Sequence, residues 1–414
     1  MPTENFNLLP SNQPSNGIVR FSGVPLINFT FAQNATAVVQ GSSIRLNGKL
    51  TCKTAAGGVI SSNTANLDPR LGVYSLFDRL SISLLNNSQI VEEIKFYNLF
   101  LSSYLGVTQS EQQILASDNV QRASAISQGS ASDIVVSGTN GGAGETEIFF
   151  SVQIPCGLFL SRSSIPLMHG LVISLNLVPD QQAFRANSGL APTYELSDLH
   201  LSGRMMTEMQ NIPDKLVYNS IQSYYSIVNS AFATLNFNLG TSQTLGAWVV
   251  FNPSENTNNY EKSGTRLLPI MKEATKPCTI RDLQFLQNGV KVALQYPIID
   301  DNSGDQTMFN SQITRNFISA IRNFASLGNT DVSPINTNLS QSFLDTADKE
   351  KGDFLYGIGL RMDYYSDNGL NMTGGNFTIQ FSSDLDTDFP NSAYMFVHTR
   401  NTLMFNNDGV QVLS

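Results

Sequence analysis

Few side chains in this sequence could carry out chemistry, and they lie far apart along the chain. The imidazoles and thiols are His169, His200, His398, Cys52, Cys156 and Cys278. A catalytic acid–base pair or a bound metal ion needs several such groups at close spacing. No histidine belongs to such a cluster, and the cysteines form neither a zinc motif nor a disulfide framework. The sequence therefore predicts structural or surface histidines, small buried thiols, and no catalytic, cofactor-binding or metal-binding residue.

Two acidic segments are the remaining candidates for a binding site. Asp384, Asp386 and Asp388 alternate in SSDLDTDFP, so in an extended segment they project from one side. The turn at residues 300–305 (DDNSGD) is also rich in carboxylates. Either segment could hold a calcium ion, which prefers oxygen ligands, or could be a solvated acidic loop. We interpret both as solvated loops.

The composition limits the classes of function that are open to the chain. Its net charge is −9, only 14% of the residues are charged, and no basic run is present. Direct wrapping of nucleic acid needs clustered Lys and Arg, so this role is excluded. We see no pattern of a signal peptide and no apolar stretch of the ~18–20 residues that a membrane helix needs. We therefore expect synthesis in the cell interior without secretion.

The stretch at residues 76–104 organises the chain. Leu80, Ile82 and Leu84 alternate with polar residues, which predicts a half-buried strand. Asn86-Asn87 then predicts a tight turn into a second short strand. From Glu92 onward the apolar period changes to that of a helix.

The same plan returns about two hundred residues later, at residues 279–292. Leu283 lies 203 positions after Leu80, Asn288-Gly289 replaces the earlier turn, and a helix is expected at about residues 309–324. Two later pairs of segments agree in order: 169–177 with 374–381, and 200–206 with 398–404. Four matches in the same order predict that the chain is a duplicated domain.

The resulting prediction is an all-β protein with a few short helices in loops. It consists of two tandem eight-stranded antiparallel jelly-roll sandwiches, a double jelly roll. Residues 1–17 are expected to be a flexible arm. The first jelly roll covers residues 18–210 with a long excursion at 106–145. The second covers residues 211–414 with an excursion at 300–353 and a C-terminal tail.

Two segments carry a resemblance to a known family. They are FDRLSISLLNNSQIVEEIKFYNLFLSSY (residues 77–104) and the C-terminal SAYMFVHTRNTLMFNNDGVQVLS, in which Arg400-Asn401 precedes an apolar strand. Together with the order of elements, they resemble the double jelly-roll major capsid proteins of tailless icosahedral double-stranded DNA viruses. That lineage includes membrane-containing bacteriophages, adenovirus hexons, virophages, polinton-like viruses and large DNA viruses of algae and protists.

The resemblance implies a structural protein of the virion and not an enzyme. Three subunits would form a pseudo-hexagonal homotrimeric capsomer that tiles the shell. Its partners would be neighbouring capsomers, penton and minor or cement capsid proteins, and an inner membrane where one exists. The two excursions would face outward, and the N-terminal arm and C-terminal tail would lie near the base. No sequence-specific binding of nucleic acid is expected.

Two other functions share the predicted sandwich fold. The first is a glycan-binding or receptor-binding protein of a virus or phage, which would expose aromatic residues in its loops. Here the aromatic residues fall within strand patterns, and the excursions are rich in Ser, Gly, Asn and Asp. The second is a glycan-acting enzyme, which needs paired carboxylates in a groove; the aspartates at 384–388 are the clustered candidates.

Overall fold

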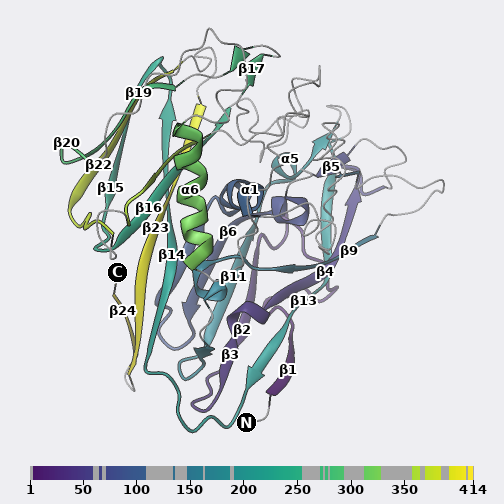
Figure 1. Cartoon of the computed structure of the whole chain (residues 1–414). Coiled ribbons are helices and arrows are strands. Elements are labelled where there is room, and N and C mark those ends of the chain that lie inside the picture. The colour runs from purple at the N-terminus through teal and green to yellow at the C-terminus, as the bar shows by residue number, and fades with distance from the viewer. Residues whose placement is uncertain are drawn as a thin grey trace.

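The computed structural model describes residues 3–58, 65–67, 71–108, 134–135, 147–161, 164–186, 191–253, 271–273, 276–277, 280–292, 312–327, 357–363, 369–383, 391–406 and 409–413. Antiparallel sheets make up most of this part of the chain, with helices α1 and α6 between them (Figure 1). The sheets built from residues before about position 210 lie on one side of the picture, and those built from later residues lie on the other.

The first half forms two facing sheets. The first small sheet has the order β2-β11-β6-β7. Its strands are β2 (Leu26–Phe31), β6 (Phe77–Leu84), β7 (Ile90–Lys95) and β11 (Leu171–Leu177). The first large sheet has the order β10-β3-β13-β4-β9, and β1 pairs with β13. Its strands are β1 (Thr3–Leu8), β3 (Val38–Gln40), β4 (Arg45–Lys53), β9 (Glu147–Gln153), β10 (Ser164–Pro166) and β13 (Thr193–Met206).

The second half repeats this arrangement. The second small sheet has the order β15-β22-β19-β20, and the second large sheet has the order β14-β23-β16-β21, with β24 added on β23. The strands are β14 (Lys215–Val228), β15 (Phe232–Leu239), β16 (Thr244–Pro253), β19 (Ile280–Gln287), β20 (Val290–Lys291), β21 (Gly357–Arg361), β22 (Gly375–Ser383), β23 (Asn391–Asn406) and β24 (Gly409–Leu413).

The two halves have the same topology when their strands are compared one by one. The order β1-β13-β4-β9 corresponds to β14-β23-β16-β21, and β2-β11-β6-β7 corresponds to β15-β22-β19-β20. Each half therefore contains the eight strands of a Greek-key sandwich in the same sequence order. The segments aligned from the sequence occupy equivalent strands: β6 with β19, β11 with β22, and β13 with β23. The predicted tandem duplication is confirmed.

A helix follows the corresponding hairpin in each half. Helix α1 (Tyr97–Thr108) comes directly after β7, and α6 (Gln312–Leu327) lies between β20 and β21. The second strand of the first hairpin continues to Lys95, and Phe96 turns the chain at a φ of 55° before the helix begins. The prediction of a helix from Glu92 onward is therefore wrong by about five residues, because Glu92 belongs to the strand and α1 begins only at Tyr97. The helix expected at residues 309–324 is found about three residues later.

The remaining elements are short. They are η1 (Gly41–Ser43), η2 (Gly72–Leu76), α4 (Gly157–Leu160), α5 (Asp180–Ala183), β5 (Ala65–Leu67), β8 (Ile134–Val135), β12 (Arg185–Ala186), β17 (Met271–Glu273) and β18 (Lys276–Pro277). No helix in the described residues is long and apolar enough to cross a membrane.

The N-terminal segment differs from the flexible arm that the sequence predicts. Strand β1 pairs with β13 from Thr3 opposite Met206 to Leu8 opposite Leu201. The ring of Phe6 packs edge-on against Phe31, with 5.1 Å between the ring centroids. The alternation in NFNL is the physical reason, because it places Phe6 and Leu8 on the core side of the sheet. The prolines and polar residues that follow obscured this short pattern.

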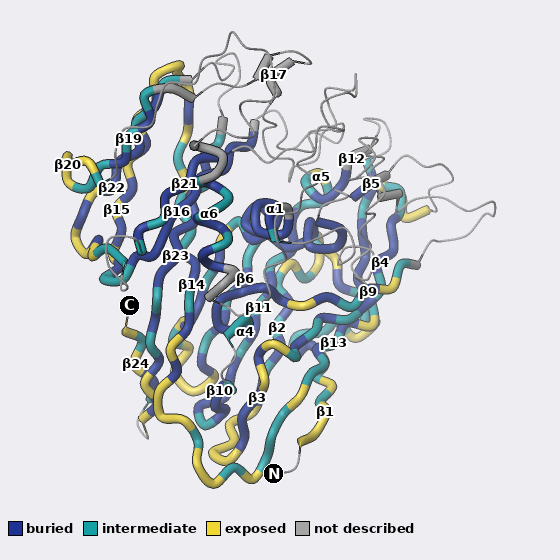
Figure 2. Tube along the Cα trace, in the orientation of Figure 1, coloured by how far each residue is buried: buried dark blue, intermediate teal, exposed yellow. Residues whose placement is uncertain are grey.

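Buried residues alternate with more exposed ones along many strands of each sandwich (Figure 2), and the buried side chains fill its interior. Strand β16 is an exception, because both of its faces are buried. Ala247, Val249 and Phe251 belong to the core of the second sandwich, whereas Trp248 and Val250 join the core of the first half. This explains the continuous apolar run in the sequence, which is typical of strands that are buried on both sides.

Candidate functional site

The strongest candidate for a functional region is the junction between the two sandwiches. Helices α1 and α6 pack against each other there, and α6 also covers β16 and β21. Aromatic rings fill the contact. The ring centroids of Phe100 and Trp248 are 6.1 Å apart, those of Phe100 and Phe396 are 5.6 Å apart, and those of Tyr104 and Phe324 are 5.8 Å apart. These rings come from both halves of the chain, so one apolar core joins the two sandwiches.

The aromatic cluster is tied to neighbouring polar groups. The indole N–H of Trp248, which is fully buried, donates a hydrogen bond to Oγ of Ser103 on α1 at 3.1 Å. The hydroxyl of Tyr218 on β14 donates to the carbonyl of Val91 on β7 at 2.7 Å. A buried Trp or Tyr needs such a partner for its polar atom, and here each partner lies on the other sandwich.

Glu92 is the least expected residue at this junction. It lies on β7 and is 2% exposed. One carboxylate oxygen accepts a hydrogen bond from the amide of Gly157 at 3.0 Å, and the other accepts one from the amide of Leu158 at 2.8 Å. Burial raises the pKa of Glu92 to about 7, although these two hydrogen bonds and those from Cys156 and Ser220 lower it.

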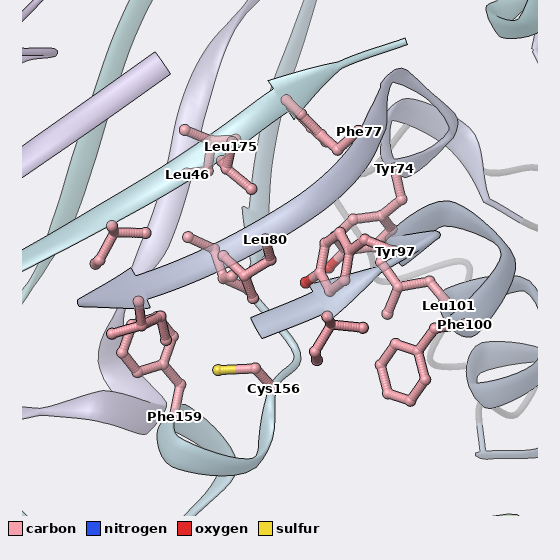
Figure 3. Packing of buried hydrophobic residues seen from close by; sticks show 14 of the residues in the cluster. Leu46, Tyr74, Phe77, Leu80, Tyr97, Phe100, Leu101, Cys156, Phe159 and Leu175 are labelled. Atoms are coloured by element: carbon pink, nitrogen blue, oxygen red, sulfur yellow. The ribbon is translucent and has the colours of Figure 1, made fainter. Parts of the chain in front are cut away.

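Helix α4 is held by Glu92 directly against the second sandwich. A Cβ atom placed on Gly157 would lie 1.4 Å from the backbone oxygen of Asn219 on β14. No side chain fits in that space, so the close approach of α4 and β14 requires glycine. Figure 3 shows Cys156, whose thiol lies among buried hydrophobic residues that include Leu80 and Phe159. Burial, and then the nearby Glu92, raise the pKa of the Cys156 thiol, which makes it unreactive.

The three histidines differ in their surroundings. His169 is 5% exposed and joins the halves: its Nδ1 lies 2.8 Å from Nδ2 of Asn86, and its Nε2 lies 2.8 Å from the carbonyl oxygen of Asn406. His200 is partly exposed, with Nδ1 2.9 Å from the carbonyl oxygen of Asp198.

His398 is completely buried beside the ring of Phe324, with 5.3 Å between the centroids, and neither of its nitrogens has a hydrogen-bond partner. Burial lowers the pKa of His398 to about 3, so it is neutral at physiological pH. His200 and His398 occupy the outward sides of equivalent strands. They differ because α6 covers the second large sheet and no described helix covers the first.

The other candidates from the sequence are mostly not described. Cys52 is buried, and burial raises the pKa of its thiol to about 12. Cys278, the aspartates at 384–388 and the turn at 300–305 lie outside the described residues. Within the described ranges, no group of three or more His, Cys, Asp or Glu side chains could hold a metal ion. Sequence reasoning overlooked Glu92, although its place opposite Ile82 in the hairpin would have indicated a core position.

The outward sides of the two large sheets are chemically different. On the second, Trp248, Val250 and Phe396 lie in the shared core. On the first, the equivalent strands β4, β9 and β13 present Lys49, Phe149 and Asp198. Nζ of Lys49 lies 2.9 Å from a carboxylate oxygen of Asp198 and 5.0 Å from the centroid of the Phe149 ring. Phe149 is 68% exposed.

No protein-family model and no curated protein matches this chain. Its structure, however, is similar to solved structures of viral capsid proteins. The Faustovirus major capsid protein is 10% identical, with a TM-score of 0.58 over 98% of this chain and 90% of that one. The PBCV-1 virus capsid, a quasi-atomic model, is 10% identical, with a TM-score of 0.60 over 100% of this chain and 96% of that one.

A third similar structure is the mavirus major capsid protein, at 11% identity and a TM-score of 0.51. It is matched over 99% of this chain and 89% of that one. The similarity extends over nearly the whole of each chain and includes both sandwiches. The fold is therefore the double jelly roll that the sequence predicts.

Proposed function

We propose that this protein is a major capsid protein, a structural subunit and not an enzyme. In this function, three copies form a pseudo-hexagonal capsomer that tiles the facets of an icosahedral double-stranded DNA virus shell. The single observation that carries the proposal is the fusion of two sandwiches of identical topology through one apolar core. The similar solved structures, which are viral capsid proteins, support it.

The physical argument is that a shell subunit needs large faces of fixed shape more than it needs reactive groups. The aromatic cluster, the hydrogen bonds of His169 and the close contact at Gly157 hold the two sandwiches in one relative position. Six similar sandwiches, two from each of three chains, then give a nearly hexagonal outline from a threefold assembly. The boundary between the jelly rolls falls between β13 and β14, close to residue 210.

The proposed partners are neighbouring capsomers, penton and minor or cement proteins, and an inner membrane where the virus has one. Apart from α6 and the end of α1, which are buried at the junction, the excursions at 106–145 and 300–353 are assigned to the outer surface, and the C-terminal tail to the base. Residues 3–8 are not assigned as a free bridging arm, because β1 is part of the first large sheet. The net charge of −9 favours a shell that does not bind the genome itself. The location is the virion, after synthesis inside the host cell.

The mass of the purified protein in solution tests this function. Light scattering should give about three times 45.2 kDa, and negative-stain images should show a hexagonal outline. A monomer or an elongated fibre would overturn the proposal. Specific binding of such a monomer to a glycan panel would then favour the glycan-binding or receptor-binding alternative.

A further inference from the structure

The outer edge of the first small sheet is closed by the segment that follows β1. Strand β2 is the outermost strand at this edge. The backbone N–H of Asn28 donates a hydrogen bond to Oδ1 of Asn12 at 2.9 Å, and its carbonyl oxygen accepts one from the amide of Ser11 at 2.7 Å. Nδ2 of Asn12 donates to the carbonyl oxygen of Leu26 at 2.6 Å. A single Ser-Asn pair therefore satisfies the edge of β2, whose backbone groups would otherwise lack a partner.

Strand β15 is the outermost strand of the second small sheet, and its structure around Asn236 is the same. On β2, Oδ1 of Asn28 accepts a hydrogen bond at 2.8 Å from the hydroxyl of Ser174, its partner on β11. On β15, Oδ1 of Asn236 accepts one at 2.9 Å from the hydroxyl of Thr378, its partner on β22. The strand sequences INFTF and LNFNL, each with this asparagine second, then align. Asn236 is therefore the equivalent of Asn28.

The pairing of the sheet shows where the backbone of Asn236 points. The carbonyl oxygen of Asn376 on β22 accepts a hydrogen bond from the amide of Asn288, so it points to the side of β19. Backbone groups change direction at each residue of an antiparallel strand, so those of Thr378 point to the same side. The N–H and carbonyl of Asn236, opposite Thr378, therefore point away from β22 to the open edge. Within the described part of the chain, neither group has a hydrogen-bond partner there.

The connecting segments explain why the two edges differ. Residues 9–25 join β1 to β2, and this length allows the chain to turn back along the edge of β2. Residues 229–231 join β14 to β15, which is too short for such a return. The sequence of β15, FATLNFNL, also has no charge and no proline, the features that commonly prevent an edge strand from binding another chain. The outward-facing side chains of β15 are exposed.

We infer that the edge of β15 at Asn236 binds a short uncharged segment of another protein chain, which presents a Ser-Asn pair as Ser11 and Asn12 do on β2. A carboxamide both accepts and donates, so it matches the N–H of Asn236 and the carbonyl of Thr234, whereas a carboxylate only accepts. Ser11 and Asn12 of the same chain are already bound to β2. That the other chain is a neighbouring or minor capsid protein rests on the proposed function, whereas the site itself does not.

A peptide with the sequence of residues 7–15, NLLPSNQPS, tests the site on the full-length protein. Saturation-transfer NMR, with the peptide in large excess, detects weak binding through the signals of the peptide itself. We expect saturation transfer to its Ser and Asn protons. The same peptide with Asn12→Asp keeps an acceptor but loses the donor, so it should bind about tenfold more weakly.

Two variants of the protein locate the binding. Asn236→Pro removes the N–H that points to the open edge and should abolish the signal. An edge strand tolerates proline where its N–H faces solvent, so we expect this variant to fold, which thermal unfolding checks. Asn236→Ala keeps the N–H and should keep the binding.

Three results would overturn the inference: no transfer with the wild type, equal transfer to both peptides, or transfer that a folded Asn236→Pro protein retains. The comparison of the two peptides needs no protein variant, so it remains decisive if Asn236→Pro does not fold. A wild-type trimer that does not bind the peptide would overturn the site alone. A wild-type monomer that binds it would overturn the proposed function alone.

Discussion

The buried carboxyl of Glu92 should make the stability of the junction depend on pH. Its pKa is raised by burial from 4.5 to about 7. Between these two values the folded protein keeps a proton on Glu92 that the unfolded chain has lost. The difference, 7 − 4.5, is about 2.5 pH units, and at about 1.36 kcal/mol per unit it corresponds to about 3 kcal/mol.

The sign follows from proton linkage. Because the folded state binds more protons in this window, the free energy of unfolding falls as the pH rises through it. The proton on Glu92 stabilises the folded state fully below about pH 4.5, and this stabilisation is lost as the pH rises through about 7. The variant Glu92→Gln is neutral at every pH, so the difference between wild type and variant isolates this carboxyl from the other groups that titrate.

Denaturant unfolding at several pH values measures the effect. Trp248 is the sole tryptophan and is buried at the same junction, so its fluorescence reports on this region. The stability of wild type relative to Glu92→Gln should fall by about 3 kcal/mol between about pH 4 and pH 8. Glu93→Gln, on the same strand, controls for the loss of a partly exposed, ion-paired carboxylate. A difference between wild type and Glu92→Gln that stays constant with pH would refute the reasoning.

Three further changes test how the sandwiches are held together. Gly157→Ala places a methyl group against a β14 carbonyl and should cost more than about 3 kcal/mol of unfolding free energy in urea; Gly240→Ala, which meets nothing within 4 Å, is its control. His169→Ala removes a buried imidazole that contacts the exposed residues Asn86 and Asn406, so it should cost about 1 kcal/mol in the same assay, whereas His200→Ala should change little. Deleting residues 1–9 removes β1, so it should lower the thermal midpoint and promote aggregation by exposing an edge of β13, as calorimetry and light scattering can show. An unchanged midpoint would contradict the role given to β1.

The features that the sequence predicted correctly are local in origin. Leu80, Ile82 and Leu84 are every second residue of β6, and all three are buried. Successive side chains of a strand point to opposite faces, so this pattern can be recognised from the strand's own sequence. The turn at Asn288-Gly289 depends on the backbone preferences of these two residues. The duplication could be recognised because such local signals returned in the same order, which required no knowledge of how the two halves pack.

The features that the sequence missed depend on contacts between distant segments. His200 and His398 occupy equivalent strands, yet one is partly exposed and the other fully buried, because α6 covers only the second large sheet. The raised pKa of Glu92 depends on its burial where β7, α4 and β14 meet, which outweighs the lowering effect of the hydrogen bonds from the α4 amides. Both environments are created when the two sandwiches pack together, and no short pattern encodes that packing.

The difference between the two large sheets also explains why the duplicated halves have diverged. The outward side of the second sheet is covered within its own chain, so apolar residues such as Trp248 and Phe396 can fill it permanently. On the outward side of the first sheet Phe149 and Asp198 are exposed, and a continuous apolar surface there would favour uncontrolled association. The ion pair of Lys49 and Asp198 beside Phe149 interrupts any such surface.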